Sequence, residues 1–335
     1  MTRTIRWGVL GCAGIAAKAV IPAIQSSRLG RVEAIASRDP GRAGEMAARF
    51  GIARAHGSYE ALLADTEIDA IYNPLPNHLH VSMTIMALEH GKPVLCEKPI
   101  ALNADEVIRL AAAQEAARLP VAEAFMVRHH PQWKRARALV AEGRIGEARA
   151  IQTIFSYYLD DPQNVRNQAS IGGGGLYDVG CYAINTARFL FGSEPLRAIA
   201  LLERDPAFDT DRLTSGLMEF PEGRQLVFTC STQLALTQAV TVLGTCGRLE
   251  IPIPFNAPAD APTRLVLDDG RDLAGGGRQE IAIEPVDQYR EQADAFAEAI
   301  LFGTPLEIGL EDAVANMKVI DALFRSAASG HWEVP

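Results

Sequence analysis

The sequence lacks the features that mark secreted, membrane-spanning and nucleic-acid-binding proteins. Its 335 residues include only five cysteines, which are scattered and show neither metal-site nor redox spacing. No apolar run approaches the roughly 18 residues that a membrane-spanning helix needs. No cluster of basic residues could follow a phosphate backbone, and the net charge is −9. We therefore expect no metal, no membrane and no nucleic acid among the partners.

An export signal is also lacking. Residues 1–4 lead directly into an apolar strand, without the apolar core of a signal peptide or a twin arginine. An odd number of cysteines fits reduced thiols, so we expect a cytoplasmic protein. With 48% hydrophobic and 22% charged residues, the composition is that of a globular protein, and the length favours two domains.

Residues 1–125 alternate short apolar strands with helices. This pattern is typical of a parallel sheet covered by helices on both faces, so we predict an α/β domain of the Rossmann type. The strands are expected at 5–10, 32–37, 70–73, 94–96 and 121–124, and the helices at 16–27, 41–50, 59–64, 78–91 and 104–118.

Residues 126–335 show longer alternating strands. They predict an α+β domain with a large, mostly antiparallel open sheet, whose last two helices could pack back on the first domain. Because few helices accompany the strands, one sheet face would stay uncovered, and we expect a homodimer or homotetramer. Strands are expected at 148–158, 196–203, 213–220, 224–230, 239–244 and 247–253, helices at 132–142, 178–191, 288–301 and 310–329, and turns over 255–277.

Small residues follow the first strand at the spacing Gly11-x-Ala13-x-x-Ala16. Such a turn lets the backbone approach a pyrophosphate at the start of the next helix. An ordinary tight turn would give the same pattern in isolation, but its place after the first strand of an alternating domain favours dinucleotide binding. The predicted contacts are Gly11, Cys12, Ala13, Gly14 and Ile15.

The end of the second strand indicates which dinucleotide binds. NAD-binding proteins usually carry an acid there, which holds the ribose hydroxyls. Here the strand ends in Ser37 and Arg38, with Arg42 one turn further on, and this set suits the 2′-phosphate of NADP. The alternative is a surface pair of Arg38 with Asp39 that has no cofactor role. We predict NADP as the cofactor, with NAD as the other possibility.

Two further segments carry candidate catalytic groups. Lys98 follows an apolar strand at the carboxyl end of the predicted sheet, where α/β proteins bind ligands. A solvated lysine beside Glu97 is the ordinary alternative. Asp178 and Tyr182 follow four glycines and would lie one turn apart on a helix that begins near Leu176. The alternative for this pair is a helix N-terminal acid and a core tyrosine.

Together these segments resemble the glucose–fructose oxidoreductase / inositol dehydrogenase (Gfo/Idh/MocA) family over the whole chain. Family members commonly carry histidine where this chain has Tyr182. Tyrosine there is similar to the branch of NADP-dependent xylose dehydrogenases and dimeric dihydrodiol dehydrogenases. Ala13 departs from the usual glycine, which the family tolerates. Besides the first turn, the resemblance lies in Asn73-Pro74-x-x-x-His78-x-His80, Gly91-Lys92-Pro93-Val94-x-Cys96-Glu97-Lys98-Pro99 and Asp178-x-x-x-Tyr182.

The resemblance implies an oxidoreductase that passes hydride between a carbinol carbon and a nicotinamide. Tyr182 would act as general base, Lys98 would favour its phenolate, and Asp178 would orient either of them. Further cofactor contacts are expected at Asn73, Pro74, Leu75, Asn77, His80, Glu97, Lys98, Met126 and Arg128, and substrate contacts at Phe155, Tyr158, Asn164, Arg166 and Tyr182.

The expected substrate is a small sugar, polyol or cyclic diol. The rings of Phe155, Tyr157 and Tyr158 could form the floor of a sugar site or could be strand core residues. A xylose-like aldose dehydrogenase is the main prediction, with a dihydrodiol dehydrogenase or a sugar oxidoreductase of the same branch as alternatives. A non-catalytic NADP-binding sensor is the alternative from another class. A sensor would not need both Lys98 and Tyr182, so their presence favours an enzyme.

Overall fold

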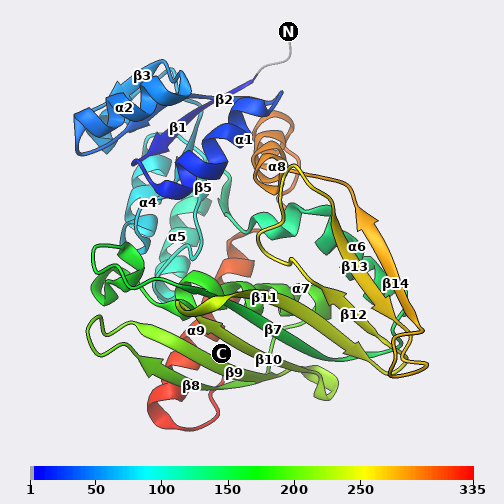
Figure 1. Cartoon of the computed structure of the whole chain (residues 1–335). Coiled ribbons are helices and arrows are strands. Elements are labelled where there is room, and N and C mark those ends of the chain that lie inside the picture. The colour runs from blue at the N-terminus through cyan, green and yellow to red at the C-terminus, as the bar shows by residue number, and fades with distance from the viewer. Residues whose placement is uncertain (1–3) are drawn as a thin grey trace. The chain divides into compact units, whose positions relative to one another are not determined.

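The computed structural model describes residues 4–335. The expectation that no export segment precedes the first strand concerns residues 1–3 and lies outside this range. By its contacts the chain divides into two compact units, which are described separately below. The first unit runs to Met126 and resumes at Gln288–Val314, and the second comprises Val127–Asp287 and Ala315–Pro335 (Figure 1).

The first unit is built on a six-stranded parallel sheet with the order β3-β2-β1-β4-β5-β6. Chain order reverses between β1 and β4, and α/β proteins bind ligands at the carboxyl ends of the strands flanking such a point. The strands are β1 (Ile5–Leu10), β2 (Gly30–Ala36), β3 (Arg54–His56), β4 (Ala70–Asn73), β5 (Val94–Cys96) and β6 (Val121–Glu123). Sequence analysis missed β3, because three residues with two basic side chains give no apolar pattern.

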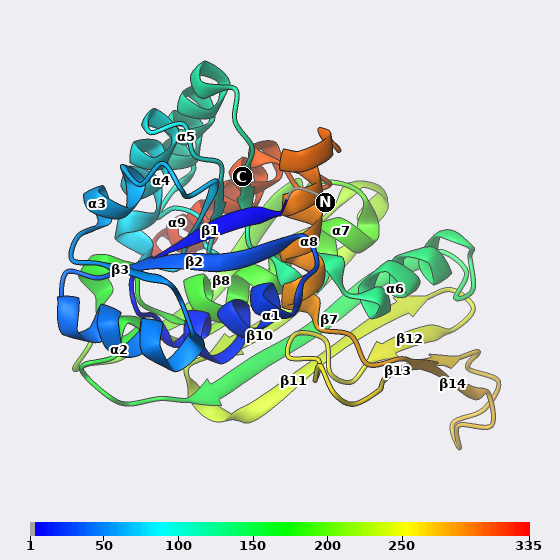
Figure 2. The ribbon, with the colours of Figure 1, turned by 90° about the horizontal axis from the view of Figure 1, so that it is seen from above.

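Helices cover both faces of this sheet (Figure 2). The helix α8 joins the unit from far along the chain: its Phe296 lies 5.7 Å from Trp7 of β1, measured between ring centroids. Both side chains are 1% exposed, so α8 completes the hydrophobic core that residues 4–126 begin. The helical segments are η1 (Ala16–Val20), α1 (Ile21–Ser26), α2 (Pro40–Phe50), α3 (Tyr59–Leu63), η2 (Asn77–Leu79), α4 (His80–Glu89), α5 (Ala104–Ala117) and α8 (Gln288–Phe302).

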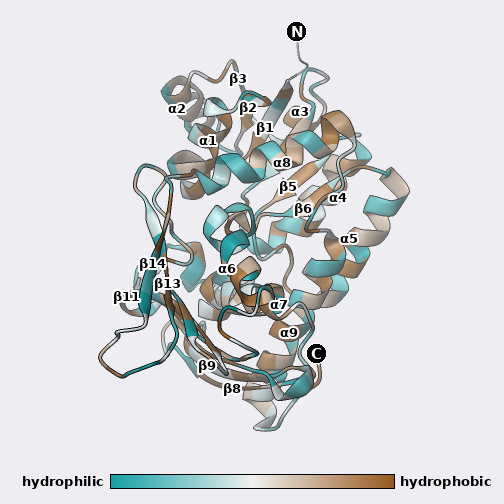
Figure 3. Cartoon of the chain, turned by 90° about the vertical axis from the view of Figure 1, so that its right-hand side faces the viewer, coloured by the Kyte–Doolittle hydropathy of each residue, from teal (hydrophilic) through white to brown (hydrophobic). Residues whose placement is uncertain are grey.

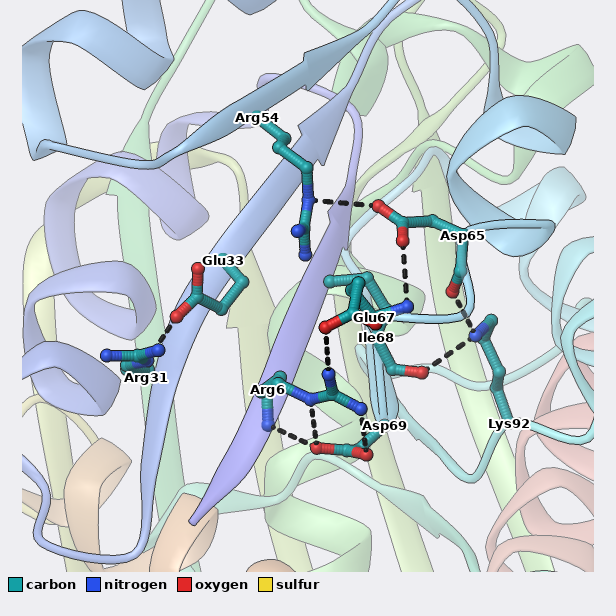
Figure 4. A network of polar contacts seen from close by, with 9 residues as sticks. All are labelled: Arg6, Arg31, Glu33, Arg54, Asp65, Glu67, Ile68, Asp69 and Lys92. Atoms are coloured by element: carbon teal, nitrogen blue, oxygen red, sulfur yellow. Dashed lines mark hydrogen bonds and ion pairs between the residues drawn. The ribbon is translucent and has the colours of Figure 1, made fainter.

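A polar network holds the amino-terminal edge of this sheet (Figure 4). Arg6 at the start of β1 binds both carboxylate oxygens of Asp69 at 2.9 Å and reaches Glu67 at 2.6 Å. Lys92 is 5% exposed, and its Nζ donates to the carbonyl oxygens of Asp65 and Ile68 at 2.8 Å each. These contacts connect the amino-terminal ends of β1 and β4, at the edge of the sheet opposite the one where a ligand is expected.

The second unit is built on an eight-stranded sheet with the order β14-β13-β12-β11-β7-β10-β9-β8. Neighbouring strands are antiparallel except for β7 and β10, so the predicted fold class is confirmed in both units. The strands are β7 (Ala148–Tyr158), β8 (Arg197–Arg204), β9 (Asp211–Glu219), β10 (Gln225–Ser231), β11 (Gln233–Gly244), β12 (Arg248–Ile251), β13 (Thr263–Asp268) and β14 (Arg278–Ile283).

Helices of the second unit lie on one face of this sheet, as Figure 3 shows for α6 and α7. On the other face the side chains of Ile199, Leu217 and Val227 form a row across β8, β9 and β10. Val227 is 45% exposed, so this apolar row is open in the single chain, and the next pair on the same face, Ser215 and Thr229, is polar. The helical segments are η3 (Met126–His129), α6 (Pro131–Ala141), η4 (Val165–Asn167), η5 (Ala169–Ile171), η6 (Leu176–Gly180), α7 (Cys181–Phe191) and α9 (Leu310–Ser329), of which Met126 and residues 310–314 belong to the first unit.

Two strands of the second unit correct the sequence prediction. The stretch 255–277 is not all turns, since it contains β13, and β14 follows it without having been predicted. Their pairing is long-range, and the surrounding Pro, Gly and Asp residues dominate the local pattern. The helix expected at 178–191 is present; it begins as a π-helical turn at Leu176, and the α-helix starts at Cys181. In residues 4–335, no helix is long and apolar enough to cross a membrane.

Candidate functional site

The turn after β1 has an open backbone at the carboxyl edge of the first sheet. Gly11 has φ of 82°, and a Cβ there would lie 2.8 Å from Leu75, so a side chain is excluded. Gly14 is exposed, and no heavy atom lies within 4 Å of the place where its Cβ would be. The following segment is a π-helical turn that begins at Ala16. The turn therefore offers backbone N–H groups to an incoming pyrophosphate.

The end of β2 carries two unengaged guanidinium groups. Asp39 caps α2, because its Oδ1 accepts from the backbone N–H groups of Gly41 and Arg42 at 2.9 and 3.3 Å. One oxygen of the carboxylate that could hold a ribose hydroxyl is thus engaged by its own helix. Arg38 and Arg42 are exposed, and among the described residues their side chains make no hydrogen bond or ion pair. Ser37 is buried and accepts from the N–H of Asp39 at 3.1 Å.

Asn73 shapes the loop that leaves β4. Its side chain is fully buried and donates to the carbonyl oxygen of His80 and the hydroxyl of Thr84 at 3.1 and 3.2 Å. Its Oδ1 accepts from the N–H of Leu75 at 3.3 Å. Asn73 therefore holds the turn from inside, and Pro74 and Leu75 are also buried, whereas Asn77 is partly exposed.

His80 joins this loop to the loop that leaves β5. Its Nδ1 lies 2.8 Å from the carbonyl oxygen of Pro99, and its Nε2 lies 2.6 Å from that of Leu75. The ring is 1% exposed. Burial lowers the pKa of His80 to about 4, while the two carbonyl oxygens act in the opposite direction. The imidazole is an internal bridge between two loops, not an exposed ligand group.

Lys98 stands at the carboxyl end of β5. The peptide bond from Lys98 to Pro99 is cis, an isomer that the sequence could not settle. Tyr72 donates its hydroxyl to Oε1 of Glu97 at 2.7 Å, and the N–H of Lys98 donates to Oε2 of Glu97 at 3.3 Å. Lys98 is partly exposed at the edge where ligands of such sheets bind.

Asp178 is the centre of a charged cluster in the second unit. Tyr157 donates its hydroxyl to Oδ2 of Asp178 at 2.5 Å, and Arg166 donates its Nε to the same oxygen at 2.9 Å. Burial, together with the neighbouring carboxylate, raises the pKa of Tyr157 above its ordinary value, so its hydroxyl stays protonated and donates. Sequence analysis grouped Tyr157 only with possible sugar-stacking rings and missed this contact.

Tyr182 belongs to an aromatic cluster at the start of α7. Its ring centroid lies 5.8 Å from Phe155 and 5.3 Å from Phe255, and its side chain is 5% exposed. Phe155 stacks on Phe255 at 4.7 Å and is 6% exposed, so it packs in the core. Tyr158 is 65% exposed, and the alternation of side chains along β7 directs it away from Phe155 and Tyr157.

The glycine run brings the Arg166 loop close to the turn of Asp178. A Cβ on Gly173 would lie 2.6 Å from the carbonyl oxygen of Arg166, which also accepts from the N–H of Gly174 at 2.9 Å. Asn164 caps the same loop by accepting from the N–H of Arg166 at 3.1 Å. Glycine is required here because the two backbones touch.

The side chains of the last two predicted cofactor contacts, Met126 and Arg128, are buried. Met126 is 4% exposed, and Arg128 is 7% exposed in the second unit, where its guanidinium lies 4.2 Å from the ring centroid of Phe189. Within the described range, the structure contains no group of three or more His, Cys, Asp and Glu side chains that could hold a metal ion.

Comparison with known families identifies both units. Residues 5–125 match the oxidoreductase family with an NAD-binding Rossmann fold, and residues 133–250 match the GFO/IDH/MocA C-terminal domain. The chain belongs to the GFO/IDH/MocA family. It is therefore an oxidoreductase with a dinucleotide-binding first unit, as the resemblance predicted.

Relatives of known sequence and structure span nearly the whole chain. An uncharacterized oxidoreductase of Rhizobium meliloti is 48% identical and covers 98% of each chain. D-xylose 1-dehydrogenase (NADP(+)) 2 of Haloferax volcanii is 39% identical over 97% of this chain and 98% of its own. The crystal structure of KijD10, a 3-ketoreductase from Actinomadura kijaniata in complex with NADP and TDP-benzene, superposes with a TM-score of 0.91 at 31% identity, covering 97% of this chain and 98% of that one.

We predict that His80→Ala destabilises the first unit, because the carbonyl oxygen of Pro99 or of Leu75, whichever accepts from the single N–H of the neutral ring, loses its buried donor and the ring leaves a cavity. The free energy of unfolding in urea should fall by about 1–3 kcal/mol, and dinucleotide binding measured by calorimetry should weaken. The control is His78→Ala, the same change at an exposed position of the same turn, which should stay within about 0.5 kcal/mol of the wild type. Equal losses in the two variants would contradict the bridging role.

Proposed function

We propose that this protein is an NADP-dependent dehydrogenase that oxidises a hydroxyl carbon of a small sugar, with a xylose-like aldose as the main candidate. The observation that carries the proposal is the pair of unengaged guanidinium groups of Arg38 and Arg42 beside Asp39, whose Oδ1 caps its own helix. The D-xylose dehydrogenase of Haloferax volcanii, named for NADP, and the ketoreductase solved with NADP support the cofactor. The first of these also supports the substrate class.

The open turn at Gly11–Ile15 and the end of β2 would bind the dinucleotide, with Ser37, Arg38 and Arg42 on the 2′-phosphate. When bound, the nicotinamide supplies a hydride acceptor. The residues named from Asn73 to Asn77, with Glu97, would shape its surroundings from the carboxyl edge. Met126 and Arg128 stay predicted contacts that would act through the backbone, since both side chains are buried.

Tyr182 would take the proton from the substrate hydroxyl. Its phenol titrates near pH 10 when free, so a neighbouring positive charge is needed to make it a base at neutral pH. Lys98 would supply that charge and hold the hydroxyl oxygen. The two residues belong to different units, so the proposal requires a substrate that both can reach. Asp178, held by Tyr157 and Arg166, would orient the acid–base group.

Arg38→Ala should weaken NADP⁺ binding by about 1–3 kcal/mol, the usual contribution of a charged hydrogen bond, and leave NAD⁺ binding unchanged. Calorimetric titration with both dinucleotides measures the difference. The control is Arg49→Ala, which removes an exposed guanidinium from the other end of α2. A wild type that binds NAD⁺ as tightly as NADP⁺ would overturn the cofactor assignment.

Tyr182→Phe keeps the ring in its aromatic cluster and removes the hydroxyl alone. We predict a fall in kcat of roughly 10²–10⁴, with NADP⁺ affinity nearly unchanged, because general acid–base catalysis contributes about that much. Lys98→Met should be comparably damaging, and the double variant should lose little more than either single one, because the two act together. Full turnover by Tyr182→Phe on the best substrate would refute this mechanism.

The substrate is decided by a turnover screen of aldoses, polyols and cyclic diols with NADP⁺. Preference for a cyclic diol would favour a dihydrodiol dehydrogenase, and reduction of a second sugar would favour a sugar–sugar oxidoreductase. NADP binding without turnover of any of these compounds would favour the non-catalytic sensor. We also place the protein in the cytoplasm, because all five cysteines are free thiols and three of them are buried.

We further propose that the apolar outer face of the second sheet mediates self-association into a homodimer or homotetramer. Sedimentation of the wild type at micromolar concentration should show the assembly, and Val227→Asp should dissociate it, because a carboxylate would be buried in an apolar interface. The control is Leu273→Asp, a change at a fully exposed loop residue, which should leave the assembly intact. A wild-type monomer would disprove the proposal.

A further inference from the structure

Asp211 lies at the start of β9, and its carboxylate is buried against the glycine run. The residue is 2% exposed. Its Oδ2 accepts from the N–H of Leu176 at 2.6 Å and from the hydroxyl of Thr214 at 3.2 Å. Leu176 is the first residue of the π-helical turn η6, so a side chain from the sheet holds the beginning of that turn.

The glycines before Leu176 fit closely around this carboxylate. A Cβ on Gly174 would lie 1.9 Å from Oδ1 of Asp211, and a Cβ on Gly175 would lie 3.2 Å from the carbonyl oxygen of Asp211. Gly174 also has φ of 120°, a conformation open to glycine alone. The second half of the glycine run thus provides space for an aspartate 37 residues further along the chain.

Gly174, Gly175 and Leu176 directly precede the proposed catalytic groups in the chain. The carbonyl oxygen of Gly174 accepts from the N–H of Asp178 at 3.1 Å. Tyr182 follows within the first turn of α7, and helical hydrogen bonds connect the whole segment. A displacement of Gly174 or Leu176 would therefore move Asp178 and Tyr182 together.

Burying this carboxylate is costly. Desolvation raises the pKa of Asp211 to about 7, whereas the bonds from Leu176 and Thr214 and the charge of Arg204 act in the opposite direction. Arg204 is the cross-strand partner of Asp211 and donates to the carbonyl oxygen of Asp209 at 2.6 Å. Because burial of this acid costs free energy, its place at the start of the turn is better explained by the fixed position it gives Leu176 than by a contribution to the stability of the fold.

We propose that Asp211 is a positioning residue for the substrate half of the enzyme, fixing through Gly174 and Leu176 the turn that carries Asp178 and Tyr182. It acts through the backbone and touches no reacting atom. The proposal rests on the function proposed above, because it treats Asp178 and Tyr182 as the groups that do chemistry.

The test compares Asp211→Ala, Asp211→Asn and a control, Asp205→Ala. Asp205 is also a buried carboxylate of the second unit, but it accepts from the N–H groups of Ala207 and Phe208 at 2.7 and 3.0 Å and from Nε2 of Gln233 at 2.8 Å, none of which belongs to the glycine run. We expect Asp211→Ala to lower kcat by roughly tenfold or more, as misplacement of a catalytic group does, without changing the KM for NADP⁺.

Asp211→Asn keeps an acceptor oxygen for Leu176, so its kcat should recover most of the loss. Asp205→Ala should lower the melting temperature and leave kcat unchanged. If Asp211→Ala lowers only the melting temperature, or if Asp205→Ala lowers kcat equally, Asp211 has a structural role alone and the proposal is wrong.

Hydrogen exchange gives a readout that does not depend on turnover. Amides of residues 174–182 should exchange faster in Asp211→Ala than in the wild type, and should be unaffected in Asp205→Ala. This result would support the positioning role even if no tested sugar were a substrate, in which case the proposed activity alone would fail. Unchanged exchange over 174–182 in Asp211→Ala would overturn the positioning role.

Discussion

The parallel pairing of β4 with β5 is the constraint on which the first unit depends. It places Asn73 beside Cys96, so the two strands end at the same level and their loops leave the sheet side by side. The loop after β4 contains the short turn η2, in which the N–H of Leu79 donates to the carbonyl oxygen of Pro76 at 2.8 Å. Asn73 adds bonds to this loop from inside, and the ring of His80 lies between the carbonyl oxygens of Leu75 and Pro99, one in each loop. Buried polar side chains thus help to shape the carboxyl edge of the sheet.

In the second unit, a charged side chain fixes the loop. Asp178 collects donors from β7 and from the Arg166 loop, and glycines let these segments approach until their backbones touch. An acid that accepts from two donors is held in one orientation, which is what an orienting group needs. In both units a polar side chain fixes a loop whose own secondary structure is limited to short turns.

Local signals in the sequence predicted the parts of the site that lie in one segment. The turn at Gly11, the lysine after β5 and the arginines after β2 are each visible within a few residues, because the roles proposed for them follow from their place at a strand end. The contacts of Tyr157 and Asp211 could not be predicted, since their partners lie 21 and 35 residues away. β13 and β14 were missed for a similar reason, because these strands at one end of the sheet are defined by the partners with which they pair.

The π-helical winding at Leu176–Gly180 has a consequence for how this segment can vary. A π turn holds one residue more than an α-helical turn, so it amounts to an insertion that the helix has absorbed. Removing one residue between Asp178 and Tyr182 would restore regular winding but leave three residue steps between them instead of four, so the relative direction of the two side chains would change. The length of this turn, as much as the identity of its residues, therefore sets which side chains face a ligand.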